Sequence, residues 1–466
     1  MSENIHNSRC PNCARLEGKI AVLQKRVAQL EQLLIEATRA NKRQAAPFSK
    51  AKPKTNPRKP GRKAGQNYGT KAHRQPPDSS EELDQIIDVP LPERCPDCGG
   101  TVEQEGLVQQ FQVEIPRRPI YVRFDVHVGR CRDCGRRIQA RHPRQCSDAL
   151  GAAGSQLGPD TQTMVTSLKS KYGLSYGKIC AILKDHFGIA LSRGGAVQVV
   201  HRTARRSEQV YQAICQVVRQ SPVVYPDETG WKVGGNNQWL WTFVTKDATV
   251  YVIRPSRGHE VAEEILGANW NGTMVHDGWS PYDFFDKAKH QQCLGHLLNR
   301  GQELVHKAIG RARHFPEKVK DFLHHALDLR NRRDEQSISE RGLAIARGRL
   351  EKRLDRLLDC QLSHSENCRF RKHLLRHRYE ILTFLYRSDI EATNWPAEQA
   401  IRPAVTNRKV FGGNRTEAGA HAQEVLASVF VSCAQRGQDA LTYLAKLICS
   451  RPECRLALVH SLLPTR

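Results

Sequence analysis

One stretch of this sequence can form neither a continuous helix nor a central strand, and it divides the chain. From Asn41 to Pro77 there are eleven Lys and Arg residues, nine Pro or Gly residues and no acidic residue. Proline lacks the backbone N–H, and proline and glycine both interrupt regular structure. We therefore expect an extended basic linker between a short N-terminal segment and a larger folded remainder.

The linker belongs to a strongly basic chain. Its 466 residues carry 72 Lys and Arg against 48 Asp and Glu, a net charge of +24. Such an excess favours a polyanionic partner, and nucleic acid is the commonest one inside cells. No apolar run is long enough to span a bilayer, and the first ten residues lack the hydrophobic core of a secretory signal. We expect an intracellular protein whose linker contacts phosphates through Lys50, Lys52, Lys54, Arg58, Lys59, Arg62 and Lys63.

Two cysteine pairs have the spacing of a structural zinc site. Cys95-Pro-Asp-Cys98 and Cys131-Arg-Asp-Cys134 are each followed by glycine, and strand-like runs at 107–115 and 120–128 lie between them. Two such knuckles at the ends of hairpins would place four thiolates around one Zn²⁺. A redox dithiol is the alternative for a single pair, but the second matched pair argues against it. The sequence therefore predicts a zinc ribbon.

The N-terminal segment has a heptad pattern. Its apolar residues are spaced by four and three in alternation, as in a coiled-coil seam: Leu16, Ile20, Leu23, Val27, Leu30 and Leu34. Because the basic linker follows and offers no adjacent core, we expect this helix to associate with a second copy of the chain. Cys10 and Cys13 precede it, and they are either zinc ligands shared across a dimer or a helix-start turn.

The pattern after the cysteine pairs is helical. Gly158-Pro-Asp160 predicts a helix start, and helices at 174–186 and 191–206 flank Phe187-Gly188. Such a pair is compatible with a helix-turn-helix that places its second helix in a DNA groove. A plain helical hairpin with exposed arginines is the alternative. The basic residues on or beside the second helix are Arg193, His201, Arg202, Arg205 and Arg206.

A strand-rich region begins at Ser221. We expect a short strand that leads into an acidic turn at Asp227, strands at 238–245 and 249–253, a helix at 258–266, and a fourth strand that ends in Asp277. Three meandering strands, a helix and a strand beside the first is the layout of a ribonuclease H-like sheet. It would place both carboxylates at neighbouring strand ends, where they could share the divalent cations of phosphoryl chemistry.

A third carboxylate lies far downstream. In the segment from Ser388 to Pro403, Thr393 or Asn394 is expected to cap a helix that carries Glu398. Arg402 lies four residues further along the same face, so a solvated ion pair with Glu398 is the alternative to a catalytic role.

These motifs resemble one family of enzymes. The sequences DETGW at Asp227–Trp231, HDGW at His276–Trp279 and NWPAEQAIRP from Asn394 are similar to those of the DDE transposases of the insertion sequence 66 family. The similarity covers nearly the whole chain. It departs from the usual pattern at Gln399, where an arginine is common, and at Leu294, where an aromatic residue is common.

The resemblance implies a function. It implies metal-dependent cleavage and strand transfer of DNA at the ends of an insertion sequence, with Asp227, Asp277 and Glu398 as catalytic residues and ligands of two Mg²⁺ or Mn²⁺ ions. It also implies further DNA contacts from Arg402, Arg408 and Lys409, and possible accessory transposition proteins. The expected location is the bacterial cytoplasm, in association with the nucleoid.

A C-x-x-H element, Cys293-Leu-Gly-His296, matches one that follows the second Asp in such enzymes. Metal binding and packing of a buried helix start are equally compatible with it. A catalytically inactive DNA-binding regulator derived from a transposase is the alternative function for the whole chain. The intact set of three carboxylates favours the enzyme.

The predicted fold is a multidomain α+β protein with a ribonuclease H-like core interrupted by a helical insertion. The expected domains are the cysteine pair and heptad helix (1–40), the basic linker (41–80), the zinc ribbon (81–150), the helix-turn-helix-like region (151–215), the first part of the core (216–292), the helical insertion (293–387), and the last part of the core with C-terminal helices (388–466).

Overall fold

The computed structural model describes residues 11–42, 83, 85–113, 115–116, 118–149 and 156–463. They fall into two compact units, 1–116 and 117–466. The DNA-contacting residues predicted in the basic linker, and Cys10, lie outside the described residues.

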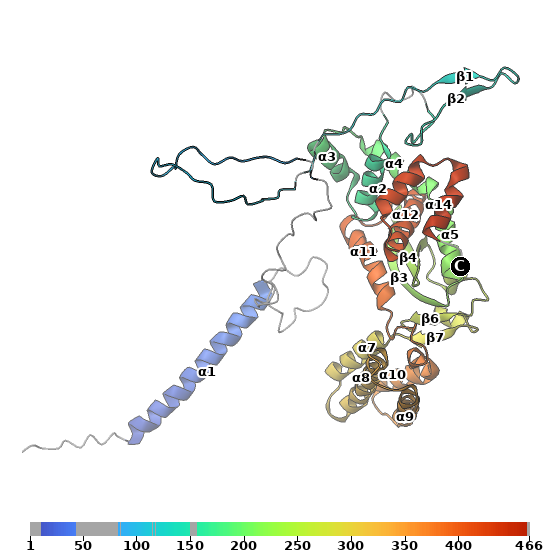
Figure 1. Ribbon diagram of the computed structural model, residues 1–466. Helices are drawn as coiled ribbons and strands as arrows, with labels where there is room; N and C mark the ends of the chain where they lie inside the picture. The colour runs from blue at the N-terminus through green and yellow to red at the C-terminus, as the bar shows by residue number, and fades with distance from the viewer. Residues whose placement is uncertain are drawn as a thin grey trace, which may run out of the picture. The chain divides into compact units, whose positions relative to one another are not determined.

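The first unit contains the predicted heptad helix. It forms a single long helix, α1 (Pro11–Lys42), shown in blue in Figure 1. Within this helix no apolar seam residue is buried. Each is more than half exposed to solvent: Leu16, Ile20, Leu23, Val27, Leu30 and Leu34.

The two cysteine pairs adopt the same turn. In the first unit, the backbone N–H of Cys95 donates to Gly100 O and that of Gly99 donates to Cys95 O, both at 2.9 Å. In the second unit, Cys131 and Gly135 repeat this pattern at 2.9 and 3.0 Å. Gly99 and Gly135 have φ values of +76° and +68°, a conformation that favours glycine. Each C-x-x-C-G sequence therefore forms a knuckle with both thiols on one tight turn.

The prediction of strands between the cysteine pairs is wrong. The described residues of 107–115 and 120–128 are not in strands, except Val128 at the start of β1 (Val128–Arg130), which pairs with β2 (Arg137–Gln139). Val108 and Ile120 are 94% and 87% exposed. Among the described residues neither β-branched side chain joins a hydrophobic core, and strand propensity reflects such packing.

The second unit is built on a five-stranded mixed sheet. Its order is β5–β4–β3–β6–β7, in which β3–β5 form an antiparallel meander, β6 is parallel to β3, and β7 is parallel to β6. The fourth predicted strand therefore lies beside the first, as expected for a ribonuclease H-like core. The strands are β3 (Val223–Val233), β4 (Asn236–Val244), β5 (Thr249–Arg254), β6 (Thr273–His276) and β7 (Lys289–Gln292).

Helices pack on the face of the meander that carries Trp241, Phe243 and Val252, and they form the larger core with it. The helix pair predicted around Gly188 is present, and serine side chains cap both of its helices at Ser175 and Ser192. The helices that contribute to this core are α2 (Pro159–Ser170), α3 (Tyr176–Phe187), α4 (Arg193–Arg206), α5 (Glu208–Arg219), α6 (His259–Leu266), α12 (Glu417–Gln435), α13 (Ala440–Cys449) and α14 (Arg455–Leu462).

Helix α12 covers the β5 edge of the sheet. Its polar residues Glu424, Ser428 and Ser432, spaced by four, accept hydrogen bonds from the backbone N–H groups of β5 residues spaced by two. Four helical residues rise about 6 Å and two strand residues about 6.6 Å, so the two repeats match. An edge that would otherwise present unpaired N–H groups is therefore covered.

The opposite face of the meander carries a smaller core. Trp231, Leu240 and Ile253 pack there against Ile401 and Ala404 of α11 (Trp395–Phe411), the helix that bears Glu398. Figure 1 shows α11, in orange, running beside β3 and β4.

The predicted helical insertion follows β7. Its helices lie together below β6 and β7 in Figure 1 and share a core with Val223, Tyr225 and Val275 of the sheet. They are α7 (Leu294–Lys307), α8 (His314–Asp334), α9 (Glu340–Leu358) and α10 (Ser365–Arg376). None of the described helices is both long enough and apolar enough to cross a membrane.

Candidate active site

Asp227 lies in the middle of β3 and not at its end. The sequence predicted an acidic turn here, but β3 continues to Val233 and pairs with β4 along the whole segment, with Asp227 opposite Thr242. Gly234 and Gly235, both with positive φ, make the turn instead. Burial, and then the negative charge of Glu228, raise the pKa of the Asp227 carboxyl to about 7, and Asp277 adds to this effect.

Asp277 directly follows β6, as predicted. Its Oδ1 accepts a hydrogen bond from the N–H of Trp279 at 2.9 Å, which closes a tight turn around Gly278. Strand β6 is the parallel neighbour of β3. The influence of Asp277 on the pKa of Asp227 reflects this arrangement.

A chain of hydrogen bonds supports the Asp277 turn. The N–H of Gly278 donates to Nδ1 of His276 at 3.1 Å, and Nε2 of His276 lies 3.0 Å from Nδ1 of His290. Nε2 of His290 lies 3.0 Å from the carbonyl oxygen of Phe285. Because a carbonyl only accepts, both imidazoles must carry their proton on Nε2, so the chain has a single direction. Burial lowers the pKa of His276 to about 3, which keeps it neutral.

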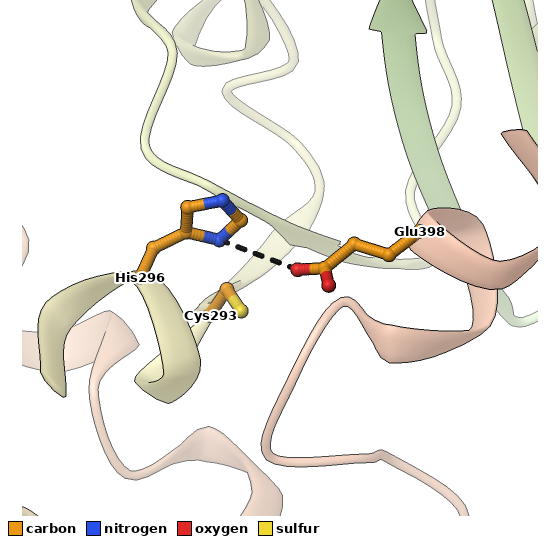
Figure 2. A group of neighbouring side chains, drawn as sticks. All are labelled: Cys293, His296 and Glu398. Atoms are coloured by element: carbon orange, nitrogen blue, oxygen red, sulfur yellow. Dashed lines mark ion pairs between the residues drawn. The ribbon is translucent and has the colours of Figure 1, made fainter. Parts of the chain in front are cut away.

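Glu398 lies in the first turn of α11. The start of this helix is fixed by Asn394, whose side-chain N–H donates to Pro226 O at 2.8 Å and whose backbone N–H donates to Sγ of Cys293 at 3.1 Å. Asn394 occupies the predicted cap position, but its side chain makes no capping bond. Glu398 Oε1 lies 3.7 Å from Nδ1 of His296 (Figure 2), and Arg402 contacts Gln399 instead.

His296 is surrounded by acidic groups. A hydrogen bond with Cys293 raises the pKa of its imidazole to about 9, and the charges of Asp277 and Glu398 contribute. His296 in turn lowers the pKa of Asp227. All three predicted carboxylates therefore interact electrostatically with the same imidazole, so residues from β3, from the end of β6 and from α11 come together around His296.

Glu228, the neighbour of Asp227, faces the other side of the sheet. Its carboxylate is 4% exposed, and it accepts hydrogen bonds from Arg257 at 2.7 and 2.9 Å and from the hydroxyl of Tyr282 at 2.9 Å. The Arg257 guanidinium stacks on the rings of Trp279 and Trp239, at 3.9 and 4.7 Å. The sequence did not point to Arg257 as a site residue. Its partners Glu228, Trp239 and Trp279 lie on other elements, so their proximity appears only in the folded chain.

The comparison with known proteins identifies the family. The family model described as "Transposase IS66 family" matches residues 154–422 of this chain. The chain belongs to this family. No curated protein matches the sequence.

As an IS66 family transposase, the protein acts in DNA transposition, and its DDE domain is a polynucleotidyl transferase. Membership of the family also implies DNA binding and a requirement for divalent metal ions. The matched segment contains Asp227, Asp277 and Glu398.

One residue predicted to contact DNA, Arg408, makes its hydrogen bonds inside the transposase. Arg408 donates to the hydroxyl of Thr229 at 2.8 Å and to the carbonyl of Gly230, so it ties α11 to β3. Arg402 and Lys409 are exposed on the same helix. Of the basic residues on or beside α4, Arg206 donates to the carbonyls of Ile448 and Cys146, whereas Arg193, Arg202 and Arg205 are exposed.

Proposed function

We propose that this IS66 family transposase uses Asp227, Asp277 and Glu398 as its catalytic carboxylates, to cleave DNA at the ends of an insertion sequence and to join the cut strand to a target. The observation that carries the proposal is the gathering of carboxylates from β3, β6 and α11 around His296. These elements are far apart in the chain, and the remaining structure holds them together.

The donor set of this site fits Mg²⁺ or Mn²⁺. Oxygen ligands suit these hard cations, and three carboxylates can hold two of them. The raised pKa of Asp227, caused by burial and by neighbouring negative charge, indicates that negative charge is in excess at this site in the bare protein. When bound, two such cations activate the attacking oxygen and stabilise the leaving oxygen of phosphoryl transfer.

The surrounding residues orient the carboxylates. Asn394 fixes the Glu398 helix against Pro226, and the His276–His290 chain holds the backbone next to Asp277. Glu228 is kept on the other face by Arg257. Preorganised carboxylates need no rearrangement when the reaction begins.

The test is cleavage of DNA carrying candidate terminal repeats, in Mg²⁺ or Mn²⁺. Substitution of Asp227, Asp277 or Glu398 by Ala should abolish cleavage and leave DNA binding nearly intact in a gel-shift assay. Glu391→Ala is the matched control, because Glu391 is exposed and lies 4.0 Å from Arg330. Glu228→Ala is a poorer control, since it would leave Arg257 unpaired. A wild-type chain that binds these DNA ends and never cleaves them would favour the regulator.

For the cysteine pairs we propose one structural Zn²⁺ held by Cys95, Cys98, Cys131 and Cys134. Support comes from the two knuckles with the same hydrogen-bond pattern. In each knuckle, backbone N–H groups lower the pKa of the first thiol, Cys95 or Cys131, which favours the thiolate that zinc requires. Metal analysis should find one zinc per chain fewer in Cys131→Ser than in wild type, and equal contents would contradict the site.

DNA contact is proposed for the basic linker. Affinity for duplex DNA should fall by about 0.9 log units per phosphate contact for each log unit of salt. Replacement of Lys50, Lys52, Lys54, Arg58 and Lys59 by Gln should flatten this slope, and an unchanged slope would exclude the linker. With DNA as substrate, the protein would act at the nucleoid of a bacterial cytoplasm, with or without accessory transposition proteins.

Self-association is proposed for α1. Its heptad residues form an exposed apolar seam on a long helix, which is the arrangement that coiled coils bury. Sedimentation of the full chain should show a change to smaller species when Leu23 and Leu30 are both replaced by Lys. Replacement of the polar helix residues Gln24 and Gln32 by Lys is the charge-matched control.

A further inference from the structure

Cys293, His296 and Glu398 bring three different metal-binding atoms to one place (Figure 2). The sulfur, an imidazole nitrogen and a carboxylate oxygen all lie within 4.8 Å of one another, and of the described residues no other group of three His, Cys, Asp or Glu does so. Nδ1 of His296 and Oε1 of Glu398 are 3.7 Å apart. Ligand atoms around a tetrahedral Zn²⁺ are roughly 3.3–3.7 Å apart, from bond lengths of about 2.0–2.3 Å. A small movement that brings the three ligand atoms closer together would therefore give the spacing of a zinc site.

The backbone around this group is already fixed. Cys293 occupies the N-cap of α7, and His296 follows in the first turn, so both side chains come from one helix start. The N–H of Leu294 donates to Ala392 O at 2.9 Å, and the N–H of Asn394 donates to the sulfur of Cys293. These bonds join the start of α7 to the segment that leads into the Glu398 helix.

The chemistry of the donors selects the ion. Mg²⁺ takes oxygen ligands almost exclusively, whereas a thiolate and an imidazole favour Zn²⁺ and similar ions. Binding would release the thiol proton of Cys293. We propose that Cys293, His296 and Glu398 form a three-ligand site for a soft divalent cation such as Zn²⁺, with the fourth position open to water, and that occupation of this site withdraws Glu398 from the catalytic carboxylates.

The withdrawal rests on the proposed catalytic role of Glu398, but the metal site itself does not. The Glu398 carboxylate cannot bind the soft cation and the catalytic Mg²⁺ ions with the same geometry. Zinc bound at this site would therefore inhibit a reaction that Mg²⁺ supports.

The first experiment measures binding without catalysis. The metal-free full chain is titrated with Co²⁺, which reports thiolate ligation by a charge-transfer band and tetrahedral geometry by visible bands. His296→Ala is the main variant, since the His296 side chain is 46% exposed and its loss leaves the packing intact. Cys293→Ser removes the sulfur itself, and Cys360→Ser is the matched cysteine control. The zinc-ribbon cysteines are present in every variant, so difference spectra remove their signal.

We expect His296→Ala to weaken one Co²⁺ site at least about tenfold, as loss of a ligand should exceed the effect of losing an outer partner. Cys293→Ser should lose one thiolate band, and Cys360→Ser should match wild type. Superimposable titrations of wild type and His296→Ala would overturn the metal site.

The second experiment measures cleavage at fixed Mg²⁺ with increasing Zn²⁺, each variant relative to its own zinc-free rate. His296→Ala should need at least about tenfold more Zn²⁺ for half-inhibition than wild type or Cys360→Ser. Equal sensitivity would overturn the sharing of Glu398. The two proposals fail differently. If Glu398→Gln still cleaves DNA while the wild-type chain binds Co²⁺, the catalytic assignment of Glu398 fails. If Glu398→Gln is inactive but Co²⁺ binding does not depend on His296, only the soft-metal site fails.

Discussion

The side-chain N–H of Asn394 donates a hydrogen bond to the carbonyl oxygen of Pro226, 2.8 Å away, although 168 residues separate the two in the chain. Asp227 follows Pro226 on β3, and Glu398 lies one helical turn after Asn394 on α11. This bond is therefore one of the contacts that hold together a strand and a helix that each carry a proposed catalytic carboxylate. Asn394 is 2% exposed, so water cannot replace it easily.

Asn394→Ala should lower the cleavage rate about tenfold or more. Loss of the donor leaves a buried carbonyl without its partner, at a cost of about 1–3 kcal/mol, and about 1.4 kcal/mol in the barrier is tenfold in rate. DNA affinity should change little. Thr406→Ala on the same helix is the control, because its hydroxyl contacts only the helix backbone at Arg402 O. Equal rates for the two variants would show that the Asn394 bond does not position Glu398.

Asp227→Asn should abolish cleavage and also stabilise the metal-free protein at high pH. The pKa of Asp227 rises from 3.8 to about 7 on folding, because of burial and nearby negative charge. The folded state thus holds this proton more tightly than the unfolded chain. The contribution of Asp227 to the free energy of unfolding is therefore fully present below pH 3.8 and is lost as pH rises through 7. At 1.36 kcal/mol per pKa unit the loss is at most about 4 kcal/mol.

Thermal unfolding in EDTA should therefore show a gap between Asp227→Asn and wild type that widens from pH 5 to pH 8. Thr229→Val, on the same strand face, should show no such widening. A gap independent of pH would contradict the charge explanation.

Gly278→Ala should impair both folding and cleavage. Gly278 has φ +89°, and a Cβ there would lie 2.5 Å from Oε1 of Gln292 and 2.9 Å from Cε1 of His373. Gly188→Ala is the control, because Gly188 also has a positive φ of +67° but no atom within 4 Å of an added Cβ. Chemical denaturation should show a loss of about 1 kcal/mol for Gly188→Ala and a larger one for Gly278→Ala. Only Gly278→Ala should lose cleavage.

Two substitutions of His276 separate the two bonds of its hydrogen-bond chain. Asparagine can place an acceptor where Nδ1 receives the N–H of Gly278, and glutamine can place a donor where Nε2 meets His290. Because the Gly278 bond adjoins Asp277, His276→Asn should keep several-fold more cleavage activity than His276→Gln at equal folded fraction. The opposite order would place the importance of His276 in its contact with His290.

Local sequence patterns predicted most helices and strands of the core, and they failed where side-chain partners decide. Strand β7, with the sequence KHQQ, has no apolar alternation, yet Gln291 and Gln292 are fully buried. Their amides bond the backbone at Ile381 and Phe384 and the carboxylate of Glu380. Conversely, the apolar runs that contain Val108 and Ile120 look like paired strands, yet in the part of the chain that the structure describes both side chains are exposed.

The sequence by itself determined the family, the ribonuclease H-like order of elements, and the three carboxylates as candidates, because each lies in a short contiguous motif or in a local periodic pattern. Tertiary structure alone decided that Asp227 lies within a strand and that Glu228 pairs with Arg257 on the opposite face of the sheet. It also decided that Arg408 joins α11 to β3 and that His296 lies beside Glu398. These relationships join residues from separate elements. Their physical basis is the burial of charges and hydrogen-bonding groups, whose partners are fixed only when the elements pack together.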